Sequence, residues 1–129
     1  MKTKKILIVD DSALFRSHVR DLLTEEPDLE IVGEAENGLE AIKKVRALEP
    51  DLVLMDIRMP LMNGIEVVHQ LKKEIPEVKA IILTIHNLLE YRKAAKKSGA
   101  DDFVVKVSMD EELIPAIRGV LNPKCVDKR

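Results

Sequence analysis

The hydrophobic pattern changes its period along the chain. Five short runs are almost continuously apolar, which is typical of strands buried on both faces of a parallel sheet. The second run is the weakest of the five because it contains the charged Glu34. The predicted strands are residues 6–9, 31–35, 52–55, 80–83 and 103–105.

The segments between these runs carry apolar residues at helical spacing. In two of them the apolar positions recur at intervals of three, as in a helix that buries one face. These positions are Leu39, Ile42, Val45 and Leu48 in one segment, and Ile65, Val68 and Leu71 in the next. A strand followed by a helix, repeated five times, predicts an α/β fold with a parallel sheet.

Capping residues mark the predicted helix starts. In four helices an Asn or a Ser stands three positions before a Glu, which resembles a capping box. The pairs are Asn37 with Glu40, Asn63 with Glu66, Asn87 with Glu90, and Ser108 with Glu111. The first helix departs from this rule, because it follows Asp10, Asp11 and Ser12 and has Phe15 where the Glu would stand. We interpret that departure as a place where function overrides local stability.

Proline and glycine mark the predicted helix ends, at Pro27, Pro50, Pro76 and Gly99. The fifth helix is harder to define. If it begins after Ser108, Pro115 lies in its second turn and removes a backbone hydrogen bond, at a cost of about 3 kcal/mol. We therefore expect a helix that is kinked or loosened near Glu111, or one that begins near Pro115. Residues 1–121 are predicted to form one domain, and residues 122–129 a polar tail or the start of a linker to an output domain.

Composition and charge narrow the class of protein. The chain has 129 residues with 21 basic and 23 acidic side chains, a formal charge of −2, which fits one soluble domain. This near-neutral charge provides no positive electrostatic field to attract a polyanion, so we expect no nucleic acid to bind this domain directly. The apolar runs are too short to span a bilayer, and Cys125 alone cannot form an intramolecular disulfide. We expect a cytoplasmic protein without membrane segments.

Chemically useful side chains stand where the predicted strands end. In a parallel sheet these ends lie along one edge, where ligands bind. If the first and third strands are neighbours, three carboxylates share a pocket and repel one another unless a cation compensates them. Oxygen ligands of this kind suit Mg²⁺, and an amine could neutralise charge from the other side. This arrangement permits phosphoryl transfer to a carboxylate. The residues are Asp10 and Asp11, Asp56, Thr84 and Lys106.

Four segments carry a resemblance to a known family. They are KILIVDDS, DLVLMDIRMPLMNGIE, AIILTIH and GADDFVVK, in this order along the chain. Over residues 4 to about 121 the chain resembles the receiver domain of a bacterial two-component response regulator. The resemblance implies a flavodoxin-like (βα)5 fold, a doubly wound parallel sheet with strand order 2-1-3-4-5.

The same resemblance implies roles for individual residues. Asp56 matches the residue that a partner histidine kinase phosphorylates, and Thr84 and Lys106 match the switch hydroxyl and the lysine that contact the phosphoryl group. The Mg²⁺ site would comprise Asp10, Asp11, Asp56 and the backbone carbonyl of Arg58. Phe103 matches the switch aromatic that turns inward when Thr84 moves, although it could also be a core residue. The altered surface would be the fourth helix, the fifth strand and the fifth helix.

Several positions depart from the commonest pattern of the family or overhang the site. Val107 follows Lys106 where many members have proline, which leaves the geometry of this peptide open. Ile85 is bulky and is expected to restrict access, and Arg58 and His86 are expected to tune the approach of water or a phosphodonor. His18 and His69 are predicted to be surface residues.

The sequence leaves alternatives for the output. The segment LTIH and the residue after Lys106 look closest to receivers of LuxR-type regulators, which suggests a DNA-binding output domain outside this chain. A stand-alone receiver acting through protein contacts, or through a homodimer, is the alternative. Two rivals from other classes are a small Mg²⁺-dependent phosphohydrolase and a flavodoxin-like FMN carrier. Both are weak, since the chain has adjacent rather than alternating acids after its first strand and no glycine or Trp suited to FMN.

Overall fold

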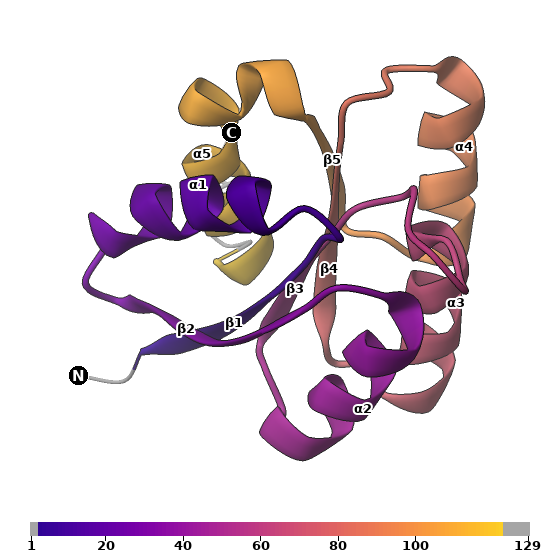
Figure 1. Ribbon diagram of the computed structural model, residues 1–129, viewed down its shortest axis with the longest axis horizontal. Helices are drawn as coiled ribbons and strands as arrows, with labels where there is room; N and C mark the ends of the chain where they lie inside the picture. The colour runs from indigo at the N-terminus through magenta and orange to yellow at the C-terminus, as the bar shows by residue number, and fades with distance from the viewer. Residues whose placement is uncertain (1–2, 123–129) are drawn as a thin grey trace.

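The computed structural model describes residues 3–122 and contains five strands and five α-helices in strict alternation (Figure 1). The strands are parallel and ordered β2-β1-β3-β4-β5, which confirms the expected topology. The strands are β1 (Lys4–Val9), β2 (Leu29–Ala35), β3 (Leu52–Met55), β4 (Lys79–Thr84) and β5 (Asp102–Val105). The helices are α1 (Ala13–Thr24), α2 (Gly38–Leu48), α3 (Gly64–Glu74), α4 (Leu89–Ser98) and α5 (Met109–Leu121), with a 3₁₀ turn at Lys106–Ser108.

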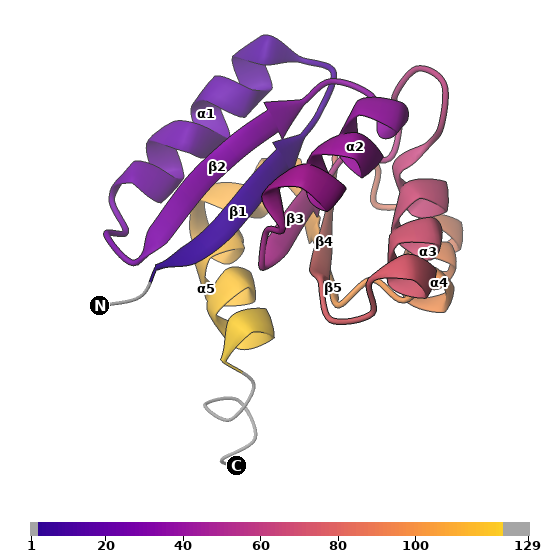
Figure 2. The ribbon, with the colours of Figure 1, turned by 90° about the horizontal axis from the view of Figure 1, so that it is seen from below.

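Helices cover both faces of the sheet. Figures 1 and 2 show α1 and α5 on one side and α2, α3 and α4 on the other. Alternate strand residues serve the two cores: Leu7 and Val53 belong to the α2–α4 side, and Ile6 and Leu52 to the α1–α5 side. Because both faces are buried, the inner strands are apolar at nearly every position.

The predicted side-chain caps form at two helices and are absent at the other two, although Ser108 does occupy the cap position of α5. The Asn37 and Asn63 side chains accept hydrogen bonds from the third amides of α2 and α3, and α3 has the complete capping box. At α4 the N-cap residue is Leu88 and not Asn87. The Asn87 side chain accepts a hydrogen bond from Arg92 Nε and not from a backbone N–H of the helix. At α5 Ser108 makes no side-chain cap, since a 3₁₀ turn leads into the helix.

The fifth helix begins at Met109, so the alternative of a start near Pro115 is wrong. Helical residues continue through Pro115, and the buried side chains Met109, Leu113 and Ile117 hold this helix against the sheet. Tertiary burial therefore compensates for the backbone hydrogen bond that proline removes. The other predicted ends are confirmed, with Gly99 in the left-handed region at φ 102° after α4. None of the helices among residues 3–122 has the length and apolar character to cross a bilayer.

Candidate functional site

Three carboxylates meet at the carboxyl edge of the sheet. Asp10 and Asp11 follow β1, and Asp56 follows β3, which is hydrogen-bonded to β1. One carboxylate oxygen from each of the three residues lies within 4.8 Å of the others. Asp10 is 2% and Asp56 7% exposed, whereas Asp11 faces solvent. The strand order thus brings together the acids that the sequence places at two separate strand ends.

The environment of Asp56 disfavours its charged form. Burial is the largest cause, and the negative charge of Asp10 adds to it, so that the pKa of Asp56 rises from 3.8 to about 6. Lys106 and the Ile57 N–H, which donates to Oδ1 at 2.9 Å, oppose this rise in pKa. Near pH 7 the carboxylate is therefore mostly ionised but poorly compensated.

Lys106 provides the positive charge of the pocket. Its Nζ donates to Asp10 Oδ2 at 2.7 Å and lies 3.8 Å from Asp56 Oδ2. The Lys106 side chain is only 14% exposed, and its Nζ lies 3.8 Å from the centroid of the Phe15 ring. The ammonium is therefore enclosed by two carboxylates and one aromatic face.

Asp10 is fixed in place on every side. Its Oδ1 accepts from the Ser12 N–H at 2.9 Å, and its main-chain carbonyl accepts from the Arg16 guanidinium. Arg16 also binds Glu34 Oε1 on β2 through its Nε, at 2.7 Å. Arg16 was not among the site residues predicted from the sequence. Nothing in the local pattern distinguishes it from the other basic residues of α1.

The loop from β3 to α3 folds back onto Asp56, and this depends on Gly64. The Gly64 N–H donates to the Ile57 carbonyl at 2.8 Å. A Cβ on Gly64 would lie 1.8 Å from the Asp56 carbonyl oxygen, so no larger residue fits this loop geometry. Gly64 was also missed, although a glycine directly after the cap residue Asn63 was a visible signal.

Thr84 ends β4 and is completely buried. Its Oγ1 accepts a hydrogen bond from the His86 N–H at 3.3 Å. The hydroxyl proton of Thr84 remains available for donation, because the oxygen acts as the acceptor in this contact.

A polar bridge lies between the loops that follow β3 and β4. The Arg58 guanidinium donates to His86 Nε2 at 3.3 Å, because a guanidinium has no acceptor of its own. The His86 ring packs edge-on against Tyr91, with centroids 5.7 Å apart. Ile85 is 67% exposed and points away from the core. The structure joins Arg58 and His86 as one pair, and Tyr91 supports it.

Phe103 lies on β5 and is half-buried against the α2–α4 core, with the Arg92 guanidinium 4.5 Å from its ring centroid. The peptide after Lys106 is trans, since residues 3–122 contain no cis bond, and Val107 is exposed. His18 and His69 are exposed, as predicted.

The acid cluster suits a hard divalent cation. Its donors are carboxylate oxygens only, and two of the three acids are buried. Burial first, and then the charge of Asp10, raise the pKa of Asp56 despite the nearby Lys106, so a further cation would stabilise the ionised cluster. A hollow of about 630 Å³ beside the cluster leaves room for solvent ligands and a phosphate; it is lined by Asp11, Ile57, Arg58, Met59, Pro60, Asn63 and Tyr91. These residues fit Mg²⁺.

Exposed apolar side chains surround the same edge. Seven large ones are exposed in the described part of the chain, and all follow the carboxyl ends of strands, in loops or in the first helical turns. They are Leu14, Leu39, Leu61, Ile85, Leu88, Leu89 and Val107.

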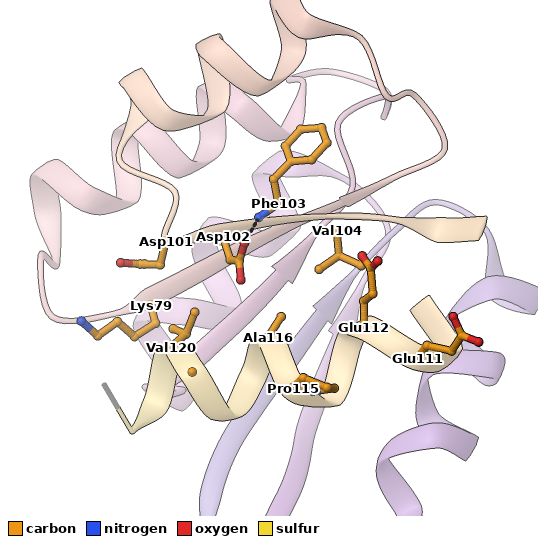
Figure 3. A pocket seen from close by; sticks show the side chains of 11 residues that line it. Lys79, Asp101, Asp102, Phe103, Val104, Glu111, Glu112, Pro115, Ala116 and Val120 are labelled. Atoms are coloured by element: carbon orange, nitrogen blue, oxygen red, sulfur yellow. Dashed lines mark hydrogen bonds between the residues drawn. The ribbon is translucent and has the colours of Figure 1, made fainter. Parts of the chain in front are cut away.

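A second hollow lies between β5 and α5, away from the cluster of Asp10, Asp11 and Asp56 (Figure 3). It has a volume of about 690 Å³. Val104 points toward α5, whereas Phe103 points to the other side of the strand (Figure 3). Four carboxylates line this groove, those of Asp101, Asp102, Glu111 and Glu112.

The chain is similar to several known proteins. It is 45% identical over 109 residues to a protein-glutamate methylesterase/protein-glutamine glutaminase of Geobacillus kaustophilus, covering 84% of this chain and 31% of that protein. It is 38% identical over 116 residues to the transcriptional regulatory protein DegU of Brevibacillus brevis, covering 90% of this chain and 49% of DegU. The chain therefore spans about a third to a half of the length of these relatives.

Solved structures agree with this similarity. The response regulator domain of Thermotoga maritima CheB superimposes with a TM-score of 0.87 at 32% identity, over 94% of this chain and 98% of that one. A LuxR-family response regulator from Aurantimonas sp. SI85-9A1 gives 0.90 at 31% identity, over 95% and 87% of the two chains. The sequence model described as the response regulator receiver domain matches residues 6–118. The chain belongs to the response regulator receiver domain family.

Proposed function

We propose that Asp56 accepts a phosphoryl group from a sensor histidine kinase and that this receiver acts as a signalling switch. One observation supports the assignment above all: Asp56 is a nearly buried carboxylate that shares its pocket with two further acids and with Lys106. A purely structural carboxylate at this depth would be expected to have its own cationic partner. The only ammonium near Asp56 in the described chain is closer to Asp10 than to Asp56.

The transfer follows from the chemistry of these side chains. A carboxylate oxygen of Asp56 attacks phosphorus, the bond from phosphorus to the donor's histidine nitrogen breaks, and its electron pair returns to the imidazole. Lys106 lies where its charge would stabilise the phosphoryl oxygens, and the Thr84 hydroxyl would donate to one of them. Asp10, Asp11, Asp56 and the Arg58 carbonyl would hold Mg²⁺, which supplies neutralisation of the charge on the transferred group.

The surroundings of the pocket support two further assignments. The exposed apolar side chains around it, among them Leu14, Leu61 and Val107, suit docking of an apolar surface of the kinase. The Arg58–His86 pair, together with Ile85, would limit the access of water and thereby slow the hydrolysis of the aspartyl phosphate. The receiver would catalyse only its own phosphorylation and dephosphorylation. It would act in the cytoplasm.

The output surface would comprise α4, β5 and α5. Phe103 lies on β5 with Arg92 of α4 over its ring, so an inward turn of Phe103 would release Arg92. The acidic groove between β5 and α5 borders the same surface (Figure 3). We infer a DNA-binding output domain after residue 121, since DegU and the Aurantimonas protein are described as transcriptional or LuxR-family regulators. The methylesterase relative makes a catalytic output domain the second candidate. The tail or linker is predicted at residues 122–129, of which residues 123–129 lie outside the described residues.

Incubation with Mg²⁺ and acetyl phosphate, followed by intact-mass analysis, tests the phosphoryl acceptor. The wild-type chain should gain one hydroxylamine-labile phosphoryl group, and Asp56→Asn should gain none. Asp21→Asn, which removes an exposed carboxylate of α1, is the matched control and should react like the wild type. Equal labelling of Asp56→Asn would exclude Asp56 as the acceptor.

A further inference from the structure

Phe15 lies against the ammonium group of the pocket but belongs to none of the functional groups assigned above. It is the third residue of α1 and is half-buried at the edge of the α1–α5 core. Its ring centroid lies 3.8 Å from Lys106 Nζ, well within the range of a cation–π contact. On the other side, the same Nζ faces Asp10 at 2.7 Å and Asp56 at 3.8 Å.

The helix start gives a reason to look beyond packing. Ser12 caps α1, and its Oγ accepts from the Phe15 N–H at 3.2 Å, which is one half of a capping box. In α3 the other half is the Asn63 N–H donating to Glu66, but in α1 the Ser12 N–H donates to Asp10 Oδ1 at 2.9 Å instead. Position 15 is therefore not needed for the cap and holds an aromatic side chain. A Glu there would bring a fourth carboxylate to the pocket of Asp10, Asp11 and Asp56.

We propose that Phe15 is a positioning residue for Lys106. A lysine side chain has a flexible stem of four carbons, so its ammonium samples many positions when it is free in water. The negative face of the aromatic ring attracts the charge and excludes water from one side, but it does not replace the hydrogen bonds of the ammonium to oxygen. The Nζ protons thus remain directed toward the carboxylates and toward an incoming phosphoryl oxygen. This inference rests on the proposed function of the pocket.

The simpler explanation is that Phe15 only fills space beside α5. Two substitutions separate the explanations. Phe15→Leu keeps an apolar side chain of similar reach and removes the aromatic face, while Phe15→Tyr keeps the face. A packing role predicts that both variants bring Lys106 to the same place, whereas the positioning role predicts that only the tyrosine does.

The first measurement reads the position of Lys106 without any phosphorylation. In protein with ¹³C-labelled lysine, the ε-methylene protons of Lys106 should show an upfield ring-current shift, assigned with Lys106→Met. The shift should persist in Phe15→Tyr. Because Phe15→Leu has no ring to cause such a shift, the position of Lys106 in all three proteins is also read from nuclear Overhauser contacts between its ε-methylene protons and the β-methylene protons of Asp10, which should weaken only in Phe15→Leu. An ordinary lysine shift in the wild type would overturn the inference even if Asp56 is phosphorylated normally.

The second measurement is the rate of phosphorylation by acetyl phosphate in a double-mutant cycle. Phe15→Leu should slow the reaction about three- to tenfold, the size expected for losing a partly desolvated cation–π contact. Phe15→Tyr should remain within about twofold of the wild type. In a Lys106→Met background the Phe15→Leu change should have no further effect. An equal effect in both backgrounds would assign Phe15 to packing alone, whereas a wild-type chain that gains no phosphoryl group would overturn the proposed function instead.

Phe15→Glu provides a third comparison, because it places a carboxylate beside Lys106 in place of the aromatic ring. We expect its phosphorylation rate to be lower than that of Phe15→Leu. A Glu variant that reacts as fast as the wild type would contradict the inference, since the added carboxylate would then not compete for Lys106.

Discussion

Aspartates at the two ends of the sheet differ in the partners that compensate their charge. Just before the strands, at their amino ends, each of three aspartates has partners of its own. Asp28 binds Arg118, Asp51 accepts from the Lys5 N–H at 2.8 Å, and Asp101 accepts from Lys72 Nζ at 2.8 Å and from the Ala80 N–H at 2.9 Å. At the carboxyl ends, Asp10 and Asp56 share one lysine, Lys106, and the exposed Asp11 lies in the same cluster without an ion pair of its own among the described residues.

The pKa values follow from this difference. Hydrogen bonds from Arg118 hold the pKa of Asp28 below its usual range, so the ionised form stabilises the fold. Burial raises the pKa of Asp56 to about 6, so its ionised form destabilises the fold. The amino end is thus arranged for stability, and the carboxyl end retains charge that a ligand can compensate.

The largest expected effect is on the stability of the Asp56→Asn variant. A pKa raised from 3.8 to about 6 corresponds to about 3 kcal/mol of unfavourable free energy when Asp56 is ionised. The folded state binds the proton more tightly than the unfolded state does. The stability that protonated Asp56 contributes should therefore be lost as the pH rises from about 4 to about 6, with no further change above that. Urea unfolding without Mg²⁺ should show the variant about 2–3 kcal/mol more stable at pH 8, with the difference vanishing near pH 4.

Asp28→Asn is the control from the other end of the sheet. It should be less stable than the wild type at pH 8, and this loss should shrink as the pH falls below the ordinary pKa of aspartate. If both variants changed stability in the same direction at pH 8, the contrast between the two ends would be wrong.

The second prediction concerns Mg²⁺. At about ten times its dissociation constant, a cation that binds only the folded chain should raise the free energy of unfolding by about 1.4 kcal/mol. Thermal melts followed by circular dichroism should show this gain in the wild type and in Asp28→Asn. Asp11→Asn, which removes an exposed member of the cluster, should lose most of the gain. Equal stabilisation of all three proteins would indicate that Mg²⁺ binds elsewhere.

The smallest effect is expected at Arg118. Its Nη2 lies 2.6 Å from Glu26 Oε1 and 2.9 Å from Asp28 Oδ1, which ties α5 to the loop between α1 and β2. Since the Arg118 side chain is 35% exposed, solvent screens these pairs, and Arg118→Met should cost only about 1 kcal/mol. The loss should decrease in high salt, and the phosphorylation rate should not change. Lys97→Met, an exposed substitution on α4, should cost less, and an equal cost would mean that the Arg118 pairs contribute nothing specific.

Local sequence signals predicted the helix caps correctly where both hydrogen-bonding partners lie within a few residues of each other in the sequence. Asn63 and Glu66 form the predicted capping box because both partners belong to the same helical turn. Asn87 has the same spacing to Glu90, but Arg92 competes for its side chain, and α4 begins without that cap. A spacing rule cannot anticipate such competition, because the outcome depends on rotamers of exposed side chains.

The sequence by itself determined the five strands, the helices between them and which acidic, hydroxyl and amine side chains stand at the strand ends, because periodicity and caps act over a few positions. Only the tertiary structure decided that Lys106 reaches Asp10, 96 positions away, that Phe15 covers its ammonium, and that Arg58 binds His86. It also decided the high pKa of Asp56, which depends on burial and on charges from other strands. These features arise from the order of the strands in space, because electrostatic and aromatic contacts depend on distance between atoms and not on separation along the chain.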